Sequence, residues 1–148
     1  MPRVLVHVLT VQDSAIDQNG HVNNLAYLGW MQDVAIQHSA AQGWPMERYL
    51  MSGTAWVVRS HFIEYLLPAF QGDSLALLTW VTGFRQHTSK RKYLVWRPAD
   101  RQVIARAETQ WVFVDAGTGR PTRVPPELQG AFEVVPEDED VLQAVREN

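Results

Sequence analysis

The alternation of hydrophobic and polar positions divides the chain into one strand, one long helix and four further strands. The strand-like runs are rich in Val, Ile, Thr and aromatic residues and span residues 3–12, 55–67, 74–84, 89–97 and 102–114. The first run has apolar side chains on both of its faces, as a largely buried strand would. Short segments with Gly, Pro, Asp or Arg join the last four runs. Successive strands should therefore pair antiparallel.

The long helix is predicted over residues 23–42, where apolar positions recur at helical spacing. Gly43 and Pro45 mark its end, because a glycine followed by a proline stops a helix. Apolar residues surround most of the cylinder. The narrow polar stripe consists of Asp33, Gln37, His38 and Gln42. A helix of this kind should be covered by other structure on most of its sides.

This order of elements predicts an α+β fold. A highly twisted antiparallel sheet that curls around the single helix uses every element, whereas a parallel sheet would need more helices than the sequence supplies. A short helix is expected at residues 127–132. We expect one domain over residues 1–135 and an acidic C-terminal tail at 136–148, which forms a surface helix or frays.

Composition narrows the class of protein. A chain of 148 residues is the size of one ordinary domain. Its net charge of −3 does not favour binding to nucleic acid, which is itself negatively charged. The absence of cysteine excludes disulfides, a thiolate nucleophile and a Cys-ligated metal. The start of the chain does not resemble a signal peptide, and no apolar run approaches the roughly 18–20 residues that cross a bilayer. We therefore expect a soluble, cytoplasmic protein without a membrane span.

A polar segment lies directly before the apolar helix, with the sequence Asp-Gln-Asn-Gly-His-Val-Asn-Asn-Leu-Ala-Tyr at residues 17–27. One interpretation is structural: Asp17 and Gly20 form a turn, and Asn23 or Asn24 caps the helix. The other is functional. The first amides of a helix lack partners within the helix, so they can polarise a carbonyl or hold an oxyanion. A carboxylate facing such a carbonyl can attack it or activate a water molecule.

Other kinds of catalytic site find little support. The five histidines never occur as a close pair, so a metal site is not expected. A triad of Asp17, His21 and a serine lacks the Gly-x-Ser-x-Gly turn that would place the serine. A positive run, Ser-Lys-Arg-Lys, occupies residues 89–92. It is either a solvated strand end or a rim that receives phosphates, and no Gly-rich nucleotide-binding motif accompanies it.

Residues 17–27 and 57–75 resemble hotdog-fold acyl thioesterases related to 4-hydroxybenzoyl-CoA thioesterase. Within these, the chain is most similar to the bacterial acyl-CoA thioesterases associated with the Tol–Pal system. Weaker similarity continues through residues 111–115 and 119–121 to 124–125. The resemblance covers most of the chain up to about residue 128, and the Asp…Gly-His-Val-Asn-Asn…Tyr signature is its most specific part.

The resemblance implies a five-stranded hotdog fold and an acyl-CoA thioesterase of lipid metabolism that acts on fatty or aromatic acyl-CoA. It implies a homodimer or homotetramer with active sites at subunit interfaces. No cofactor is implied, since coenzyme A enters as part of the substrate. The catalytic residues by this match are Asp17 as nucleophile or general base, His21, and Asn24 through its backbone amide. The expected substrate-binding residues are Asn19, Asn23, Tyr27, Trp30, Arg59, Lys90, Arg91 and Lys92.

Three alternatives stay open. Plant acyl-ACP thioesterases carry a glutamate shortly before a Gly-Asp-like turn, and the corresponding region of this chain, residues 67–73, contains no glutamate, which weakens an ACP-specific mechanism. Hotdog hydratases and dehydratases use an Asp-x-Asn-Pro-x-His pattern, and Gly20-His21 departs from it in both the proline and the spacing. The third alternative is a hotdog protein that binds acyl groups without turnover.

Overall fold

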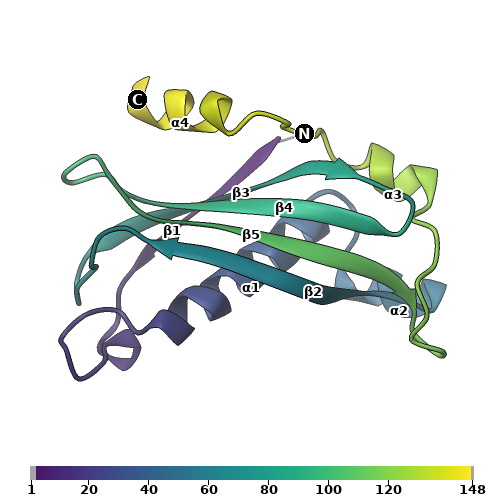
Figure 1. Ribbon diagram of the computed structural model, residues 1–148, viewed down its shortest axis with the longest axis horizontal. Coiled ribbons are helices and arrows are strands. Elements are labelled where there is room, and N and C mark those ends of the chain that lie inside the picture. The colour runs from purple at the N-terminus through teal and green to yellow at the C-terminus, as the bar shows by residue number, and fades with distance from the viewer. Residues whose placement is uncertain (1–2, 148) are drawn as a thin grey trace.

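A five-stranded antiparallel sheet curls around one long helix in the computed structural model, which describes residues 3–147 (Figure 1). The strands are β1 Val4–Thr10, β2 Thr54–Tyr65, β3 Ser74–Phe84, β4 Thr88–Arg97 and β5 Gln102–Asp115. The helices are the single-turn η1 Asp13–Ala15, α1 Asn24–Ala41, α2 Met46–Ser52, α3 Pro126–Gly130 and α4 Asp138–Glu147. The strand order is β1-β3-β4-β5-β2. The predicted α+β fold, with the sheet wrapped around a central helix, is confirmed.

Helix α1 begins where the capping chemistry predicts. The side chain of Asn23 accepts a hydrogen bond from the Leu25 N–H at 2.8 Å and thereby satisfies one free amide of the first turn. Gly43, with φ of 93°, follows the helix end in the left-handed conformation that glycine tolerates. Local chemistry therefore sets both ends of α1.

The predicted polar stripe on α1 was wrong in part. The face of α1 toward the sheet consists of Tyr27, Met31, Val34, Ala35 and His38. His38 is only 1% exposed and Gln42 is buried as well, whereas the apolar Ile36 is exposed. The sheet covers one side of the helix, so its position relative to α1 decides which stripe is buried.

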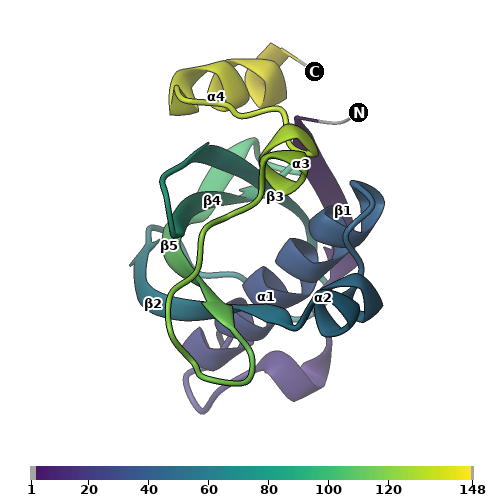
Figure 2. The ribbon, with the colours of Figure 1, turned by 90° about the vertical axis from the view of Figure 1, so that its right-hand side faces the viewer.

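Strands β3 and β4 are buried on both faces. Their inward side chains, among them Leu77 and Tyr93, pack against α1. Their outward side chains, among them Trp80 and Trp96, pack against Val141 of α4. Figure 2 shows α4 on the side of the sheet opposite to α1. The acidic C-terminal segment therefore forms a helix that covers the sheet.

Two features differ from the expectation. The sequence analysis left residues 46–52 unassigned, yet they form α2 between Pro45 and Gly53, whose φ of 69° ends the helix. Strand β1 is not largely buried, because Val6 and Val8 on its outer side are exposed at the edge of the sheet. Within residues 3–147, no helix has both the length and the apolar character needed to span a membrane.

Candidate functional site

The loop before α1 is tied together by Asp17. Its Oδ1 accepts hydrogen bonds from the N–H groups of Asn19 at 2.9 Å and His21 at 3.3 Å. Gly20 has a φ of 78°, which the turn requires, and an isolated bridge joins Ile16 to Val22. The turn interpretation of this segment is therefore realised, but it uses only one oxygen of the carboxylate.

The second oxygen of Asp17 is available for chemistry. Oδ2 accepts no hydrogen bond from any residue in 3–147, and the side chain is only half-buried. An open hollow of about 670 Å³ lies beside it. The hollow is lined by Ile16, Asp17, Gln18, Asn19 and Asn23. A ligand in this hollow would contact the carboxylate directly.

An unpaired backbone amide lies at the same end of α1. The Leu25 N–H donates to the side chain of Asn23, and the Ala26 N–H donates to its carbonyl at 3.0 Å. The N–H of Asn24, the first helical residue, has no acceptor within residues 3–147. This amide is at the positive end of the helix dipole, where an anion or a polarised carbonyl is favoured.

The aromatic positions of the signature are anchored in the core. Tyr27 is buried and meets the rings of Trp30 and Tyr65 edge-on, at centroid distances of 5.2 and 5.4 Å. Burial, and then the neighbouring Tyr65, raises the pKa of Tyr27 to about 12. The ring of His21 lies against Phe70 at 5.5 Å, on the exposed side of the loop. Tyr27 therefore holds the start of α1 in place, and His21 remains reachable from solvent.

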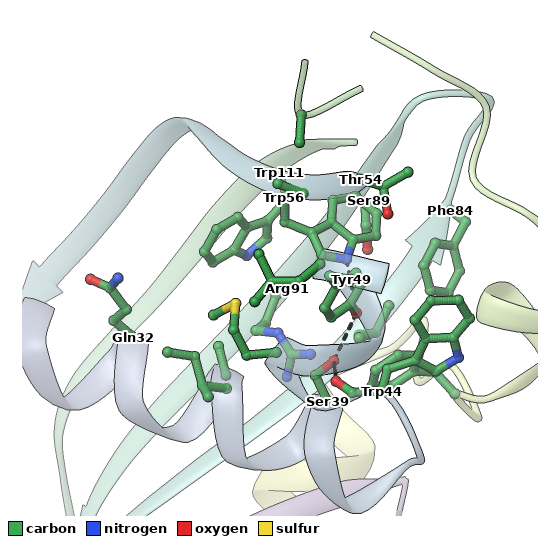
Figure 3. A pocket seen from close by; sticks show the side chains of 18 residues that line it. Gln32, Ser39, Trp44, Tyr49, Thr54, Trp56, Phe84, Ser89, Arg91 and Trp111 are labelled. Carbon is green, nitrogen blue, oxygen red and sulfur yellow. Dashed lines mark hydrogen bonds between the residues drawn. The ribbon is translucent and has the colours of Figure 1, made fainter. Parts of the chain in front are cut away.

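A second, more enclosed cavity of about 230 Å³ lies at the other end of α1, and the sequence analysis did not identify it. Its aromatic lining, shown in part in Figure 3, comprises Trp44, Tyr49, Trp56, Phe84, Trp111 and Phe132. The Tyr49 hydroxyl lies 2.8 Å from Ser39 Oγ and accepts a hydrogen bond from Trp56 Nε1 at 3.1 Å. Helix α2 forms one wall of the cavity, and α2 was not among the elements predicted from the sequence.

A family model for the thioesterase-like superfamily matches residues 11–132, most of the chain. The chain belongs to the thioesterase-like superfamily. The predicted family is thereby confirmed, while membership of the Tol–Pal-associated branch stays a prediction. The matched range includes the loop with Asp17, helix α1 and the whole sheet except β1.

Solved structures of similar fold include a 1,4-dihydroxy-2-naphthoyl-CoA thioesterase from Synechocystis, with a TM-score of 0.79 and 19% identity over 86% of this chain and 94% of that one. A Staphylococcus aureus protein in complex with CoA gives a TM-score of 0.81 and 16% identity over 86% and 80% of the two chains. A curated relative is the chloroplastic palmitoyl-acyl carrier protein thioesterase of Gossypium hirsutum, 26% identical over 124 residues. The match covers 79% of this chain, which spans only 29% of that protein.

The positive run of this superfamily member does not form the single rim that the sequence suggested. Successive strand residues point to opposite faces of a sheet. Lys90 and Lys92 form ion pairs with Glu108 at 3.5 Å and Asp138 at 2.7 Å. Arg91 lies inside the fold and is one of the residues that line the aromatic cavity.

Arg59 differs from the positive run. It is exposed on β2, at an irregularity in the pairing of β2 with β5, and it forms no ion pair within residues 3–147. Residues 3–147 contain no group of three or more His, Cys, Asp or Glu side chains placed to hold a metal ion. The catalytic and substrate-binding roles assigned from the sequence stay predictions.

Proposed function

We propose that this chain is an acyl-CoA thioesterase that hydrolyses the thioester of a fatty or aromatic acyl-CoA to the free acid and CoA. The observation that carries the proposal is the pairing of two features at one end of α1. One is the Asp17 carboxylate, which keeps a free oxygen beside an open hollow. The other is the unpaired N–H of Asn24. Membership of the thioesterase-like superfamily supports the same reaction.

In the proposed mechanism the thioester carbonyl oxygen accepts a hydrogen bond from the Asn24 N–H, which stabilises the negative charge that develops on it. Asp17 either attacks the carbonyl carbon or removes a proton from the attacking water. The carbon–sulfur bond then breaks, and the departing thiolate takes up a proton. If Asp17 attacks, a water molecule next hydrolyses the resulting anhydride and restores the carboxylate.

Exposed apolar side chains support the proposal of a homo-oligomer with active sites at subunit interfaces. They lie on α1 and along β2, which is an edge strand of the sheet. The set comprises Leu25, Ile36, Val57, Val58, Phe62 and Tyr65. Exposed apolar side chains that gather along one element of a chain are typical of a protein interface. Whether the assembly is a dimer or a tetramer stays open.

The nature of the carrier and the acyl group is the finer part of the proposal. One structural neighbour is a naphthoyl-CoA thioesterase and another was solved with CoA, which supports CoA as the carrier. The curated plant relative acts on palmitoyl-acyl carrier protein, which keeps acyl-ACP as the second possibility. We propose Arg59 as a contact for the phosphates of the carrier, because its charge is exposed and has no acidic partner within residues 3–147.

Release of free thiol from a panel of short, long and aromatic acyl-CoAs tests the proposal. Wild-type protein is expected to release thiol from at least one class. Asp17→Asn should lower the rate about 10²- to 10⁴-fold, the usual contribution of a positioned acid or base. The variant keeps an oxygen to bind the amides of Asn19 and His21, so the loop is expected to stay folded. Asp13→Asn is the matched control, since Asp13 is exposed nearby and does not line the hollow.

The same panel separates the alternatives. Full activity of Asp17→Asn would overturn the assignment of the carboxylate. With an enoyl-CoA, loss of the double-bond absorbance without thiol release would indicate a hydratase. Tight binding of acyl-CoA without any thiol release would indicate a protein that only binds acyl groups.

A further inference from the structure

The aromatic cavity at the second half of α1 is mainly apolar and contains a few polar groups. Its entrance is bordered by Ile36 of α1 and by Met46 and Leu50 of α2, all of which are exposed. Inside, Ser39, Tyr49 and Ser89 bring hydroxyl groups to the lining. Figure 3 shows Arg91 among the side chains that line the cavity.

Arg91 is the unusual member of this lining. Arg91 is only 6% exposed, yet its guanidinium donates hydrogen bonds to neutral side chains. Nη1 donates to His38 Nδ1 at 2.9 Å and to Thr79 Oγ1 at 3.1 Å, and the guanidinium lies 5.7 Å from the centre of the Phe132 ring. Because a guanidinium only donates, the accepting nitrogen of His38 carries no proton, so the imidazole is neutral. No carboxylate in residues 3–147 forms an ion pair with Arg91.

A buried cation without a counter-charge is costly, and proteins rarely keep one unless something compensates it. Burial lowers the pKa of Arg91, but an arginine stays protonated in proteins. The group that best matches a guanidinium is a carboxylate, which can accept two parallel N–H bonds. Two observations therefore point to the same kind of ligand. The apolar lining of the cavity would favour an apolar body, and the buried charge of Arg91 would favour an anionic end.

The size of the cavity sets the length of the ligand. Its volume of about 230 Å³ compares with about 30 Å³ for one water molecule in the liquid, which leaves room for roughly eight groups of that size. Its first lining residue on α1, Gln32, lies about eight residues beyond Asn24, or roughly 12 Å along the helix. The cavity is therefore separate from the hollow beside Asp17 in the same chain.

We propose that this cavity binds a free apolar carboxylic acid of about eight carbons, with its carboxylate paired to Arg91 and its chain among the aromatic side chains. Within one chain the site lies apart from Asp17 and Asn24, and the proposal does not rest on their catalytic role. It is a binding site for an amphipathic anion, in which Arg91 of β4 provides the positive charge and α1 and α2 form walls.

Titration of the wild-type protein with octanoate, methyl octanoate and octylamine at neutral pH tests the proposal. Trp44, Trp56 and Trp111 line the cavity, so their fluorescence reports occupancy, and calorimetry gives the stoichiometry. Octanoate should bind one molecule per chain, at least about tenfold more tightly than the neutral ester, as a hydrogen-bonded charge pair requires. Equal affinity for the acid and the ester, preferential binding of the amine, or no binding of octanoate would overturn it.

Arg91→Met tests whether the charge of Arg91, as opposed to the shape of the cavity, is needed for binding of octanoate. Methionine fills similar space without the charge, so the variant should lose at least about tenfold in octanoate affinity while its affinity for the ester is unchanged. Unchanged octanoate binding by a folded Arg91→Met would overturn the proposal. If the variant does not fold, the comparison of acid and ester on the wild-type protein still decides. Asp17→Asn should bind octanoate like the wild type, so failure of the thioesterase assignment does not affect this test.

Discussion

Arg91 of β4 donates a hydrogen bond to His38 of α1 at 2.9 Å, although 53 positions separate them in the sequence. Both side chains are buried, so the bond is made where little water can replace it. It joins the central helix to the middle of the sheet beside the aromatic cavity. The stability of the fold and the polarity of the cavity therefore depend on the same pair.

Replacement of His38 by Ala should destabilise the protein by about 2 kcal/mol or more, because it leaves a buried guanidinium with one neutral acceptor fewer. Urea unfolding measures the change. Gln37→Ala is the matched control on the exposed side of α1 and should have almost no effect. The double variant His38→Ala/Arg91→Met should recover part of the loss, and a purely additive result would show that the two residues do not interact.

Replacement of Asn23 by Ala should lower the free energy of unfolding by about 1 kcal/mol, since the Leu25 N–H loses its side-chain acceptor. Asn23→Asp keeps an acceptor at the positive end of the helix and should be close to the wild type. Chemical denaturation followed by circular dichroism compares the three proteins. Equal stability of Asn23→Ala and Asn23→Asp would contradict the capping role.

The raised pKa of Tyr27 predicts a loss of stability in alkaline solution. The phenol has a pKa of about 12 when folded against a usual value of 10.0, so its contribution is complete below pH 10 and is lost as the pH rises from 10 to 12. Tyr27→Phe removes this titration and should lose less stability over that interval than the wild type. Tyr65→Phe, at a more exposed ring, should reduce the loss less. Identical pH profiles for all three proteins would refute the prediction.

Replacement of Val141 by Ala should cost about 1–3 kcal/mol, because this buried side chain holds α4 against the outer face of β3 and β4. Gln143→Ala, on the exposed side of the same helix, is the control. Thermal unfolding gives the difference, and binding of a hydrophobic dye reports exposure of Trp80 and Trp96. A Val141→Ala variant as stable as its control would mean that α4 does not pack on the sheet in solution.

Element boundaries followed closely from local sequence. The expected strand at residues 74–84 is β3, Ser74–Phe84, and the expected helix at 23–42 is α1 with one residue fewer at each end. Turn residues and a capping Asn carry this information within a few positions. Helix α2 was missed although Pro45, Glu47 and Gly53 are helix start and stop signals, because seven residues are too short to show a clear period.

The part of the candidate site whose residues are close together in the sequence could be predicted from the sequence. Asp17, Asn23 and Asn24 lie within one turn and one helix start, so the sequence alone brings them together. The positive residues 90–92 are also adjacent in the sequence, but the prediction that they share one surface was wrong. Strand alternation sends Arg91 inward and Lys90 and Lys92 outward, and this period was readable in the sequence. Residues next to each other in a loop share a site, whereas neighbours in a strand do not.

The order of the elements, the helix cap and the polar loop could be predicted from the sequence, because each depends on interactions between residues a few positions apart. The packing of distant segments buries His38, brings Arg91 to it, and makes α2 one wall of the aromatic cavity that Arg91 lines. Those outcomes depend on how the curved sheet is set against α1. A side chain's burial is the result of what packs against it from distant parts of the chain, and local patterns do not contain that information.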